Sequence, residues 1–327
     1  MILGIDVGGT KTEAVLADRS GNVLAFQRGK GANYQTIGEE EAYLRIKQIL
    51  DGILKEAAID VEEIDDCFMG VAGADFDYDY EIIDRIIKRL GLKKYGFDND
   101  GLIALRSGTL KDPGILVTCG TGSINYAYNG KEIERKGGFS QFFGERLGAR
   151  YVARLAASAA TRAIDGRGDA TLMKDMIEEK AGIDIPQLMN CEYHDQRYQG
   201  PDPIKLIITS LFEAARKNDF MAVKILVKIA EEVIRIVKSF LIHMEFEKPI
   251  KLVLEGTVFK VADKKLIDMI QTGLGEDFEV IIPLQDPVIG AALISMEREN
   301  WELSDEIINR LITQFKIKKD KVMRKEN

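Results

Sequence analysis

The sequence predicts an α/β protein built from two lobes. At 327 residues the chain exceeds the usual size of a single domain. Its first third alternates strand-like and helix-like stretches. A glycine turn between two strand-like stretches near the N-terminus recurs about 110 residues later, in the same sequence context. A repeat at this distance is too wide for a solenoid and indicates two similar lobes, each opening with a glycine hairpin.

The first lobe is expected to span residues 1–112. Three successive stretches of strand-forming residues, separated by turn residues, predict a β-meander over residues 2–7, 13–17 and 23–27. Apolar residues at helical spacing then predict a surface helix. The later elements of this lobe are predicted as helix 40–58, strand 67–71, helix 79–90 and edge strand 95–98.

The second lobe is expected to span residues 113–298. Its opening segment, residues 114–130, repeats the order of strand, glycine turn, strand and Asn-Gly hairpin turn. Residues 151–248 are predicted as a helical insertion, and its longest helix, residues 219–246, has a broad apolar face and could form a dimer surface. The remaining predicted elements are strand 251–255, helix 262–274, strand 279–282 and helix 287–297.

The last segment, residues 299–327, contains a predicted amphipathic helix over residues 305–315. This helix could pack back on the first lobe. The basic tail that follows, residues 316–325, is expected to be frayed and solvated.

Composition disfavours two classes of protein. The chain is 46% hydrophobic and 30% charged, and no stretch approaches the roughly 18 apolar residues that a membrane helix needs. Its 45 Lys and Arg residues against 53 Asp and Glu residues give a net charge of −8, which disfavours binding to nucleic-acid phosphates. A small-molecule partner is therefore expected.

The N-terminus and the cysteines indicate a cytoplasmic protein. Met1 leads directly into an apolar strand without a basic leader or a cleavage site. The three cysteines, Cys67, Cys119 and Cys191, are odd in number and far apart, so they provide neither a disulfide framework nor a clustered metal motif. Both observations fit a reducing compartment.

Two glycine turns are the candidate phosphate sites. Backbone N–H groups of such turns can approach an anion closely, because no side chain stands in the way. One such turn alone is usually an ordinary hairpin, but the second lies at the same point of a matching meander. Facing one another, the two would hold a polyphosphate from both sides. Their residues are Gly8, Gly9, Thr10 and Lys11 in the first turn and Gly120, Thr121, Gly122 and Ser123 in the second.

Two carboxylates lie at the ends of predicted strands. Asp6 ends the first strand, where an apolar residue is expected; it could hold a hydrated Mg²⁺ or simply cap the turn. Asp100 follows the edge strand and precedes a helix-like stretch. A carboxylate there could take a proton from a hydroxyl that attacks a phosphate, or could belong to a helix N-cap cluster.

With these features the sequence resembles the superfamily of ATPases that contains sugar kinases, the seventy-kilodalton heat-shock proteins and actin. Within it, the sequence is similar to the group of N-acetylglucosamine kinases and BadF/BadG-type ATPases, from Met1 to about Glu297. Residues 6–12, DVGGTKT, resemble the first phosphate motif of this group, and residues 120–123, GTGS, resemble the second. The resemblance implies two ribonuclease H-like lobes, as in actin-like ATPases, with a cleft between them.

The resemblance also implies site residues and an activity. Asn99 and Asp100 resemble the catalytic pair, with Asp100 as the base. The implied activity is phosphorylation of a sugar hydroxyl by ATP with Mg²⁺, the acceptor being N-acetylglucosamine, glucosamine or a related amino sugar and the enzyme a homodimer. The implied sugar-binding residues are Asn33, Asn99, Asp100, Gly138, Phe139 and Glu145, and the implied adenosine-binding residues are Gly256 and Thr257.

Two segments depart from the family pattern. The adenosine motif has a single Gly256 where relatives usually show two adjacent glycines. Residues 144–150, GERLGAR, replace a Gly-Asp-Glu-Gly-Ser segment, and Phe139 replaces a tryptophan. Arg146 and Arg150 thus bring positive charge. Either both arginines point outward from a helix start, or the pocket favours an acceptor that bears an anionic group.

Other functions within the superfamily are predicted less strongly. Some ATPases of the BadF/BadG group activate acyl-CoA dehydratases or reductases through an iron–sulfur cluster that cysteines of two short motifs hold. Here the three cysteines lie in dissimilar surroundings. A sugar-responsive repressor is disfavoured, because the sequence starts at the first strand and lacks clustered zinc cysteines. The kinase is the leading prediction, and the activator is the alternative.

Overall fold

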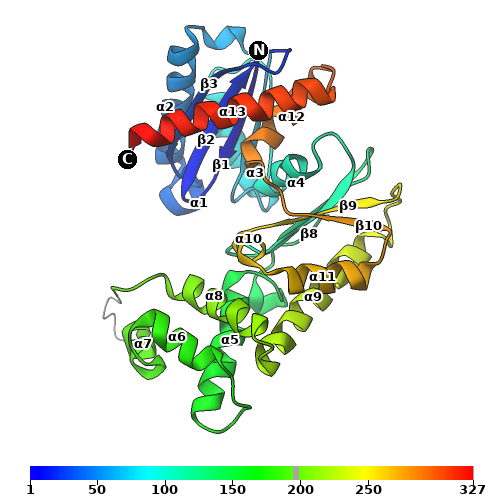
Figure 1. Ribbon diagram of the computed structural model, residues 1–327. Helices are drawn as coiled ribbons and strands as arrows, with labels where there is room; N and C mark the ends of the chain where they lie inside the picture. The colour runs from blue at the N-terminus through cyan, green and yellow to red at the C-terminus, as the bar shows by residue number, and fades with distance from the viewer. Residues whose placement is uncertain (194–198, 327) are drawn as a thin grey trace. The chain divides into compact units, whose positions relative to one another are not determined.

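The computed structural model describes residues 1–193 and 199–326. The chain folds into two compact units, both drawn in Figure 1. Unit 1 comprises Met1–Pro113 and Pro283–Asn327, and unit 2 comprises Gly114–Ile282. Each unit contains a five-stranded sheet.

The sheet of unit 1 has the strand order β3-β2-β1-β4-β5. Strand β1 pairs antiparallel with β2 and parallel with β4, so a meander is extended by two parallel strands. Every residue of β1 is buried, as its mostly apolar sequence predicts for all but Asp6. The strands are β1 (Ile2–Val7), β2 (Lys11–Ala17), β3 (Val23–Lys30), β4 (Asp66–Val71) and β5 (Tyr95–Asp98).

Helices cover both faces of this sheet, and each face has its own hydrophobic core. One core packs α2 and α3 against the sheet, and the other packs α12 and α13 against the opposite face. Figure 1 shows α13 lying across the strands of unit 1. The helices are α1 (Tyr34–Ile37), α2 (Glu39–Ala57), α3 (Asp77–Lys88), α4 (Asp100–Thr109), α12 (Pro287–Arg298) and α13 (Asp305–Glu326), and a 3₁₀ turn spans Val61–Glu63.

Helix α12 belongs to unit 1, although it was predicted from the sequence to lie in the second lobe, residues 113–298. Two glycines explain this difference. A Cβ on Gly4 would lie 2.5 Å from the backbone nitrogen of Ala292, and a Cβ on Gly290 would lie 1.9 Å from the carbonyl oxygen of Ile103. Because neither glycine has a Cβ, α12 packs closely against both β1 and α4.

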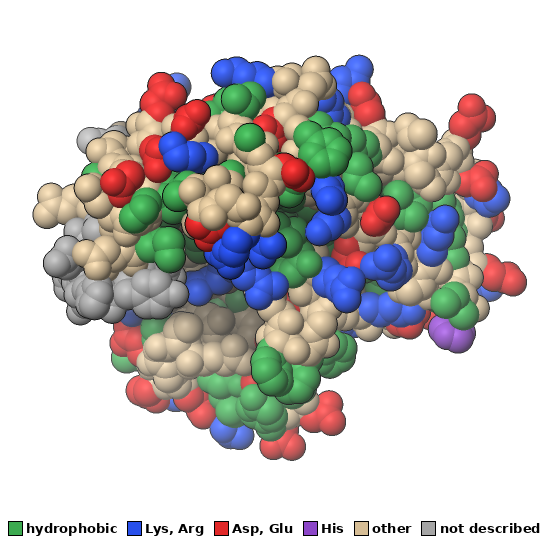
Figure 2. Space-filling view, turned by 90° about the horizontal axis from the view of Figure 1, so that it is seen from below, with side chains coloured by type: hydrophobic (Ala, Val, Ile, Leu, Met, Phe, Trp, Pro, Cys, Tyr) green, Lys and Arg blue, Asp and Glu red, His purple; other side chains and the backbone are tan. Residues whose placement is uncertain are grey.

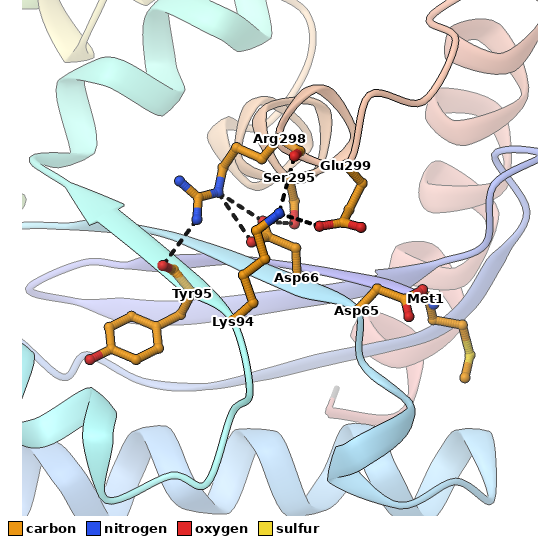
Figure 3. A network of polar contacts seen from close by, with 8 residues as sticks. All are labelled: Met1, Asp65, Asp66, Lys94, Tyr95, Ser295, Arg298 and Glu299. Atoms are coloured by element: carbon orange, nitrogen blue, oxygen red, sulfur yellow. Dashed lines mark hydrogen bonds and ion pairs between the residues drawn. The ribbon is translucent and has the colours of Figure 1, made fainter.

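A buried ion pair also anchors α12 to the sheet, as Figure 3 shows. Asp66 of β4 is fully buried and accepts hydrogen bonds from Arg298 Nε at 3.0 Å and from Ser295 Oγ at 2.7 Å. The same guanidinium donates to the carbonyl oxygen of Tyr95 at 3.0 Å. One end of α12 is therefore tied to β4 and β5 by charge-assisted hydrogen bonds.

The expectation of a frayed basic tail is wrong for the residues that the structure describes. Helix α13 continues through Glu326, and its Phe315 is buried against Phe26 of β3, with the ring centroids 5.2 Å apart. Lys318 reaches Glu56, and Lys319 reaches Asp286 at 2.7 Å. Acidic groups of unit 1 thus pair with lysines of the basic tail. The run of basic residues in the sequence does not by itself predict these ion pairs.

The sheet of unit 2 has the order β10-β9-β6-β7-β8, again an antiparallel meander extended by parallel strands. Its strands are β6 (Gly114–Thr118), β7 (Ile124–Tyr128), β8 (Ile133–Gly137), β9 (Ile250–Glu255) and β10 (Phe278–Ile281). Its helices are α5 (Ala149–Ile164), α6 (Met173–Ala181), α7 (Ile185–Tyr193), α8 (Pro203–Arg216), α9 (Phe220–Phe240), α10 (Thr257–Val261) and α11 (Lys264–Leu274), and a 3₁₀ turn spans Gln141–Phe143. The predicted α/β class with two similar sheets is confirmed.

Helix α9 ends at Phe240, six residues before the predicted end. The backbone N–H of Met244 donates to the carbonyl oxygen of Phe240 at 3.0 Å, and the Met244 side chain is buried in the core of unit 2. Met244 therefore belongs to a turn that folds back on the core, whereas Leu241 and Ile242 are 37% and 71% exposed. Among the described residues, none of the helices combines the length and the apolar character that crossing a membrane requires.

Candidate active site

The first glycine turn joins β1 to β2 and is held by the loop that follows β3. Gly8 N–H donates to the carbonyl oxygen of Lys11 at 2.9 Å, and Gly31 N–H donates to that of Thr10 at 3.1 Å. A Cβ on Gly31 would lie only 2.1 Å from the carbonyl oxygen of Gly9, whereas a Cβ on Gly9 would meet nothing within 4 Å. The turn is thus supported from one side and open on the other, as a phosphate site requires.

Asp6 is the buried carboxylate at the end of β1, and its side chain is 8% exposed. Burial, followed by the negative charge of Asp100, raises the pKa of Asp6 to about 7, while Lys11 acts in the opposite direction. Glu13 and Asp286 add further to this rise in the pKa. Asp6 and Asp100, two separate candidates in the sequence, therefore interact electrostatically.

The donor set at Asp6 fits a hydrated Mg²⁺ ion. Among the described residues, no group of three or more Asp, Glu, His or Cys side chains is arranged to hold a metal ion by itself. Mg²⁺ commonly keeps several waters and uses one or two carboxylates together with substrate phosphates. Asp6 supplies such a carboxylate, and a nearby cation would offset the cost of ionising it in a buried place.

Cations surround the buried Glu13, which pairs with Asp6 across β1 and β2. Glu13 is fully buried and forms ion pairs with Lys11 and, at 3.5 Å, with Lys319 of α13. A cavity of about 470 Å³ adjoins the turn. Its lining consists of Thr10, Lys11, Arg28, Gly29 and Lys30, so three of its five residues carry positive charge.

Asn99 and Asp100 begin helix α4. Asn99 is 3% exposed and caps the helix, because its Oδ1 accepts a hydrogen bond from Gly101 N–H at 2.9 Å. Its Nδ2 donates to Asp75 Oδ1 at 3.1 Å. Asp100 is the first residue of α4 and is half-buried. The N-cap interpretation is therefore correct for Asn99, and it leaves Asp100 at the helix start, near Asp6.

Asn33 caps the short helix α1, and its Oδ1 accepts a hydrogen bond from Gln35 N–H at 2.9 Å. The residue before it, Ala32, donates its N–H to the carbonyl oxygen of Gly8 at 3.0 Å. The predicted sugar-binding Asn33 and the predicted phosphate turn thus lie on adjoining loops of unit 1.

The second glycine turn lies in unit 2, between β6 and β7. Gly120 N–H donates to the carbonyl oxygen of Gly122 at 3.1 Å, and Ala149 N–H, at the start of α5, donates to that of Gly120 at 2.6 Å. Thr121 and Gly122 are exposed, whereas Ser123 is 4% exposed. Of the two predicted hydroxyl donors, Thr121 is thus the accessible one.

The predicted sugar-binding residues of unit 2 adjoin this turn. Gly138 N–H donates to the carbonyl oxygen of Ser123 at 3.0 Å, and Glu145 Oε1 accepts from the N–H groups of Gly138 and Phe139. The Phe139 side chain is 61% exposed. Glu145 therefore holds the loop of residues 137–139 in place. Arg146 and Arg150 are exposed, which fits the expectation that they point outward.

Gly256 packs against the second turn. Its φ of 111° lies in the region that favours glycine, and a Cβ there would lie 2.4 Å from the carbonyl carbon of Cys119. Cys119 N–H in turn donates to the carbonyl oxygen of Glu255 at 2.8 Å. Thr257 is exposed as the first residue of α10. A single glycine at this position is sufficient for the close packing.

Some residues of these sites were not predicted from the sequence. Asp286, Lys319 and Glu13 all lie close to Asp6 or its neighbours. Glu13 follows Lys11 and Thr12 in β2, so its local sequence does not distinguish it from an ordinary polar strand end. No local signal existed for Lys319, which is brought there by the packing of α13. A cavity of about 700 Å³ between α9 and α11 is lined by none of the predicted site residues.

The chain is similar to proteins of one family over nearly its whole length. A family described as the BadF/BadG/BcrA/BcrD ATPase family matches residues 3–295. An N-acetyl-D-glucosamine kinase of Dictyostelium discoideum is 25% identical over 90% of this chain and 98% of the relative. An N-acetylmuramic acid/N-acetylglucosamine kinase of Clostridium acetobutylicum is 27% identical over 90% of this chain and 97% of the relative.

Similarity extends to solved structures. A provisionally assigned N-acetylglucosamine kinase of Chromobacterium violaceum superposes with a TM-score of 0.69 at 21% identity, covering 90% of this chain and 98% of that one. At this level of identity the match establishes the fold.

Proposed function

Since the chain belongs to the BadF/BadG/BcrA/BcrD ATPase family, we propose that it is an ATP-dependent kinase that phosphorylates a hydroxyl of an amino sugar. The observation that carries the proposal is the placement of Asp100 at the start of α4, in electrostatic contact with the buried Asp6 that precedes the first glycine turn. The names of the two curated relatives support an amino sugar as the acceptor.

In this proposal each group has one task. The two glycine turns, residues 8–11 and 120–123, bind the nucleotide phosphates through backbone N–H groups other than those of Gly8 and Gly120, which donate within the turns. Asp100 accepts the proton of the acceptor hydroxyl. The oxygen of this hydroxyl attacks the γ-phosphorus of ATP, and ADP leaves. Mg²⁺, bound with the nucleotide beside Asp6, would neutralise charge on the phosphate oxygens. Asn33, Asn99 and Glu145 orient the acceptor, and Gly256 and Thr257 adjoin the adenosine.

The acceptor class is tested by ADP release in a coupled assay. We expect turnover with N-acetylglucosamine or glucosamine, little turnover with glucose, and almost none without a sugar. N-Acetylmuramic acid belongs in the panel, because one relative is named for it and because Arg146 and Arg150 add positive charge near the start of α5. ADP release that is independent of any sugar would contradict the proposal.

Asp100→Asn tests the assigned base. We expect sugar phosphorylation to fall about a hundredfold to ten-thousandfold while ATP binding persists, because a general base typically contributes about 10²- to 10⁴-fold. Asp305→Asn is the matched control, since Asp305 also occupies the first position of a helix and is exposed. Loss of ATP binding together with activity would show that the assignment is wrong.

The alternative role as an activator with an iron–sulfur cluster is less well supported. Cys67 and Cys119 are both buried, and burial raises the pKa of the Cys119 thiol to about 12. The side chain of Cys191 lies outside the residues that the structure describes. A brown, oxygen-sensitive preparation would favour this alternative over the kinase.

A homodimer remains a prediction, and the exposed side of α9 is the proposed surface. Phe220 and Val227 of this helix are 66% and 39% exposed. Sedimentation equilibrium of the wild type and of Val227→Glu would test it, with a monomeric wild type contradicting the proposal. Figure 2 shows one face of the structure, on which Lys and Arg side chains lie together with Asp and Glu side chains.

A further inference from the structure

Two loops of unit 1 adjoin the residues proposed to bind the acceptor. We call them the acceptor loops, residues 31–37 and residues 72–79. The first contains Asn33, and the second contains Asp75, whose carboxylate accepts the hydrogen bond from Asn99 beside Asp100. Neither Asp75 nor Asp79 was predicted from the sequence as a site residue.

Asp79, in the first turn of α3, lies at the junction of the two loops. Its side chain is fully buried. One oxygen accepts hydrogen bonds from Tyr34 Oη and, at 3.2 Å, from Gln35 Nε2. The other accepts from the backbone N–H groups of Asp75 at 3.1 Å and Phe76 at 2.7 Å. One carboxylate therefore binds the side chains of the first loop and the backbone of the second.

Further contacts keep the loops together. Gln35 Nε2 also donates to the carbonyl oxygen of Gly73 at 3.1 Å. A Cβ on Gly73 would lie 2.9 Å from Asn33 Oδ1, so the loops touch directly at Asn33. A shift of either loop would therefore displace Asn33 and Asp75 relative to each other.

The Tyr34–Asp79 pair keeps its protonation states near neutral pH. Burial acts to raise the pKa of Asp79, but the hydrogen bonds from Tyr34, Phe76, Gln35 and Asp75 together bring the pKa below its ordinary value. Burial and the hydrogen bond to Asp79 raise the pKa of Tyr34. The phenol thus remains a donor and the carboxylate an acceptor, which gives a charge-assisted hydrogen bond.

We propose that Tyr34 and Asp79 are positioning residues that join the two acceptor loops and so orient Asn33 and Asp75 toward the sugar. This inference rests on the proposed function. It adds a determinant of acceptor binding that lies outside the groups expected to touch the substrate. The first glycine turn is held by the N–H groups of Gly31 and Ala32, at the start of the first acceptor loop, whereas Asp79 binds Tyr34 and Gln35 farther along that loop.

Tyr34→Phe removes the phenol donor and keeps the ring, and unit 1 contains a matched control. Tyr95, the first residue of β5, donates to Asp84 of the same helix α3 at 2.6 Å. Tyr95→Phe and Asp84→Asn therefore each remove another hydrogen bond between a tyrosine and an aspartate of α3. Tyr95 begins β5, whereas Asn99 follows the last residue of this strand. Of the two test variants, Asp79→Asn should have the larger effect. Its amide NH₂ group cannot accept the hydrogen bonds that one carboxylate oxygen of Asp79 accepts.

We expect Tyr34→Phe to raise KM for the amino sugar about tenfold, and Asp79→Asn about a hundredfold, with KM for ATP changed less than threefold. Tyr95→Phe and Asp84→Asn should leave both KM values within a factor of two. Equal effects of the test and control variants on the sugar KM, or a parallel rise in both KM values of a test variant, would overturn the inference.

Hydrogen–deuterium exchange separates failure of this inference from failure of the proposed function. Tyr34→Phe should increase amide exchange in residues 31–37 and 72–79, whereas Tyr95→Phe should not. Unchanged exchange in these loops would overturn the inference, whatever the acceptor. Absence of amino-sugar turnover in the wild type would overturn both the proposed function and the acceptor role, while faster exchange would then show only that the pair joins the loops.

Discussion

The raised pKa of Asp6 leads to a measurable dependence of stability on pH. In the folded chain this pKa is about 7, against an ordinary value of 3.8, because the carboxyl is buried near Asp100. The folded state therefore retains this proton to a higher pH than the unfolded state does, and the resulting stabilisation is lost as pH rises from about 4 to about 7. At about 1.4 kcal/mol per pKa unit the full effect is about 4 kcal/mol, with about 3 kcal/mol of it between pH 5 and pH 8.

Asp6→Asn removes this titration. From pH 5 to pH 8 the free energy of unfolding of the wild type should fall by about 3 kcal/mol more than that of the variant. Urea denaturation without nucleotide and with a chelator measures it, and Trp301, the single tryptophan, reports on unit 1 because it packs against the core formed by α12 and α13. Asp51→Asn, at an exposed carboxylate, should follow the wild type. Parallel pH curves for the wild type and Asp6→Asn would refute the reasoning.

Two other substitutions test how unit 1 supports the site. Gly31→Ala should destabilise unit 1 by about 1–3 kcal/mol and weaken ATP binding, because its Cβ would overlap the carbonyl of Gly9, whereas Gly9→Ala should leave the urea midpoint nearly unchanged. Arg298→Ala should cost about 3–5 kcal/mol, because it leaves Asp66 buried without its cation (Figure 3), and Lys94→Ala, at an exposed pair, about 0–1 kcal/mol. Equal urea midpoints of Gly31→Ala and Gly9→Ala would contradict the packing argument. Equal urea midpoints of Arg298→Ala and Lys94→Ala would contradict the ion-pair argument.

Much of the fold follows from local patterns in the sequence. The bounds of β1 and β5 agree with prediction to the residue, because strand-forming runs are bounded there by glycine, asparagine and aspartate. The two glycine turns and the N-cap cluster before α4 also depend on neighbouring residues alone, although Asp100, expected to precede the helix, is its first residue. The repeated meander was sufficient to predict two similar sheets, which the structure confirms.

Contacts between distant segments decided the rest. The close packing of Gly4 and Gly290 assigns α12 to unit 1, and no periodicity in the helix itself encodes that choice. Lys319 pairs with Asp286 only because α13 packs on the sheet. A charge run predicts a solvated tail when its partners, which lie elsewhere in the chain, are unknown.

The chemistry of the site divides in the same way. The residue types and their spacing were enough to select Asp6 and Asp100 as candidates, since each interrupts a predictable local pattern. Their mutual effect on the pKa of Asp6 and the four hydrogen bonds at Asp79 depend on burial and on distances between loops. Such quantities exist only after the chain has packed, because water is then removed from groups that are far apart in the sequence.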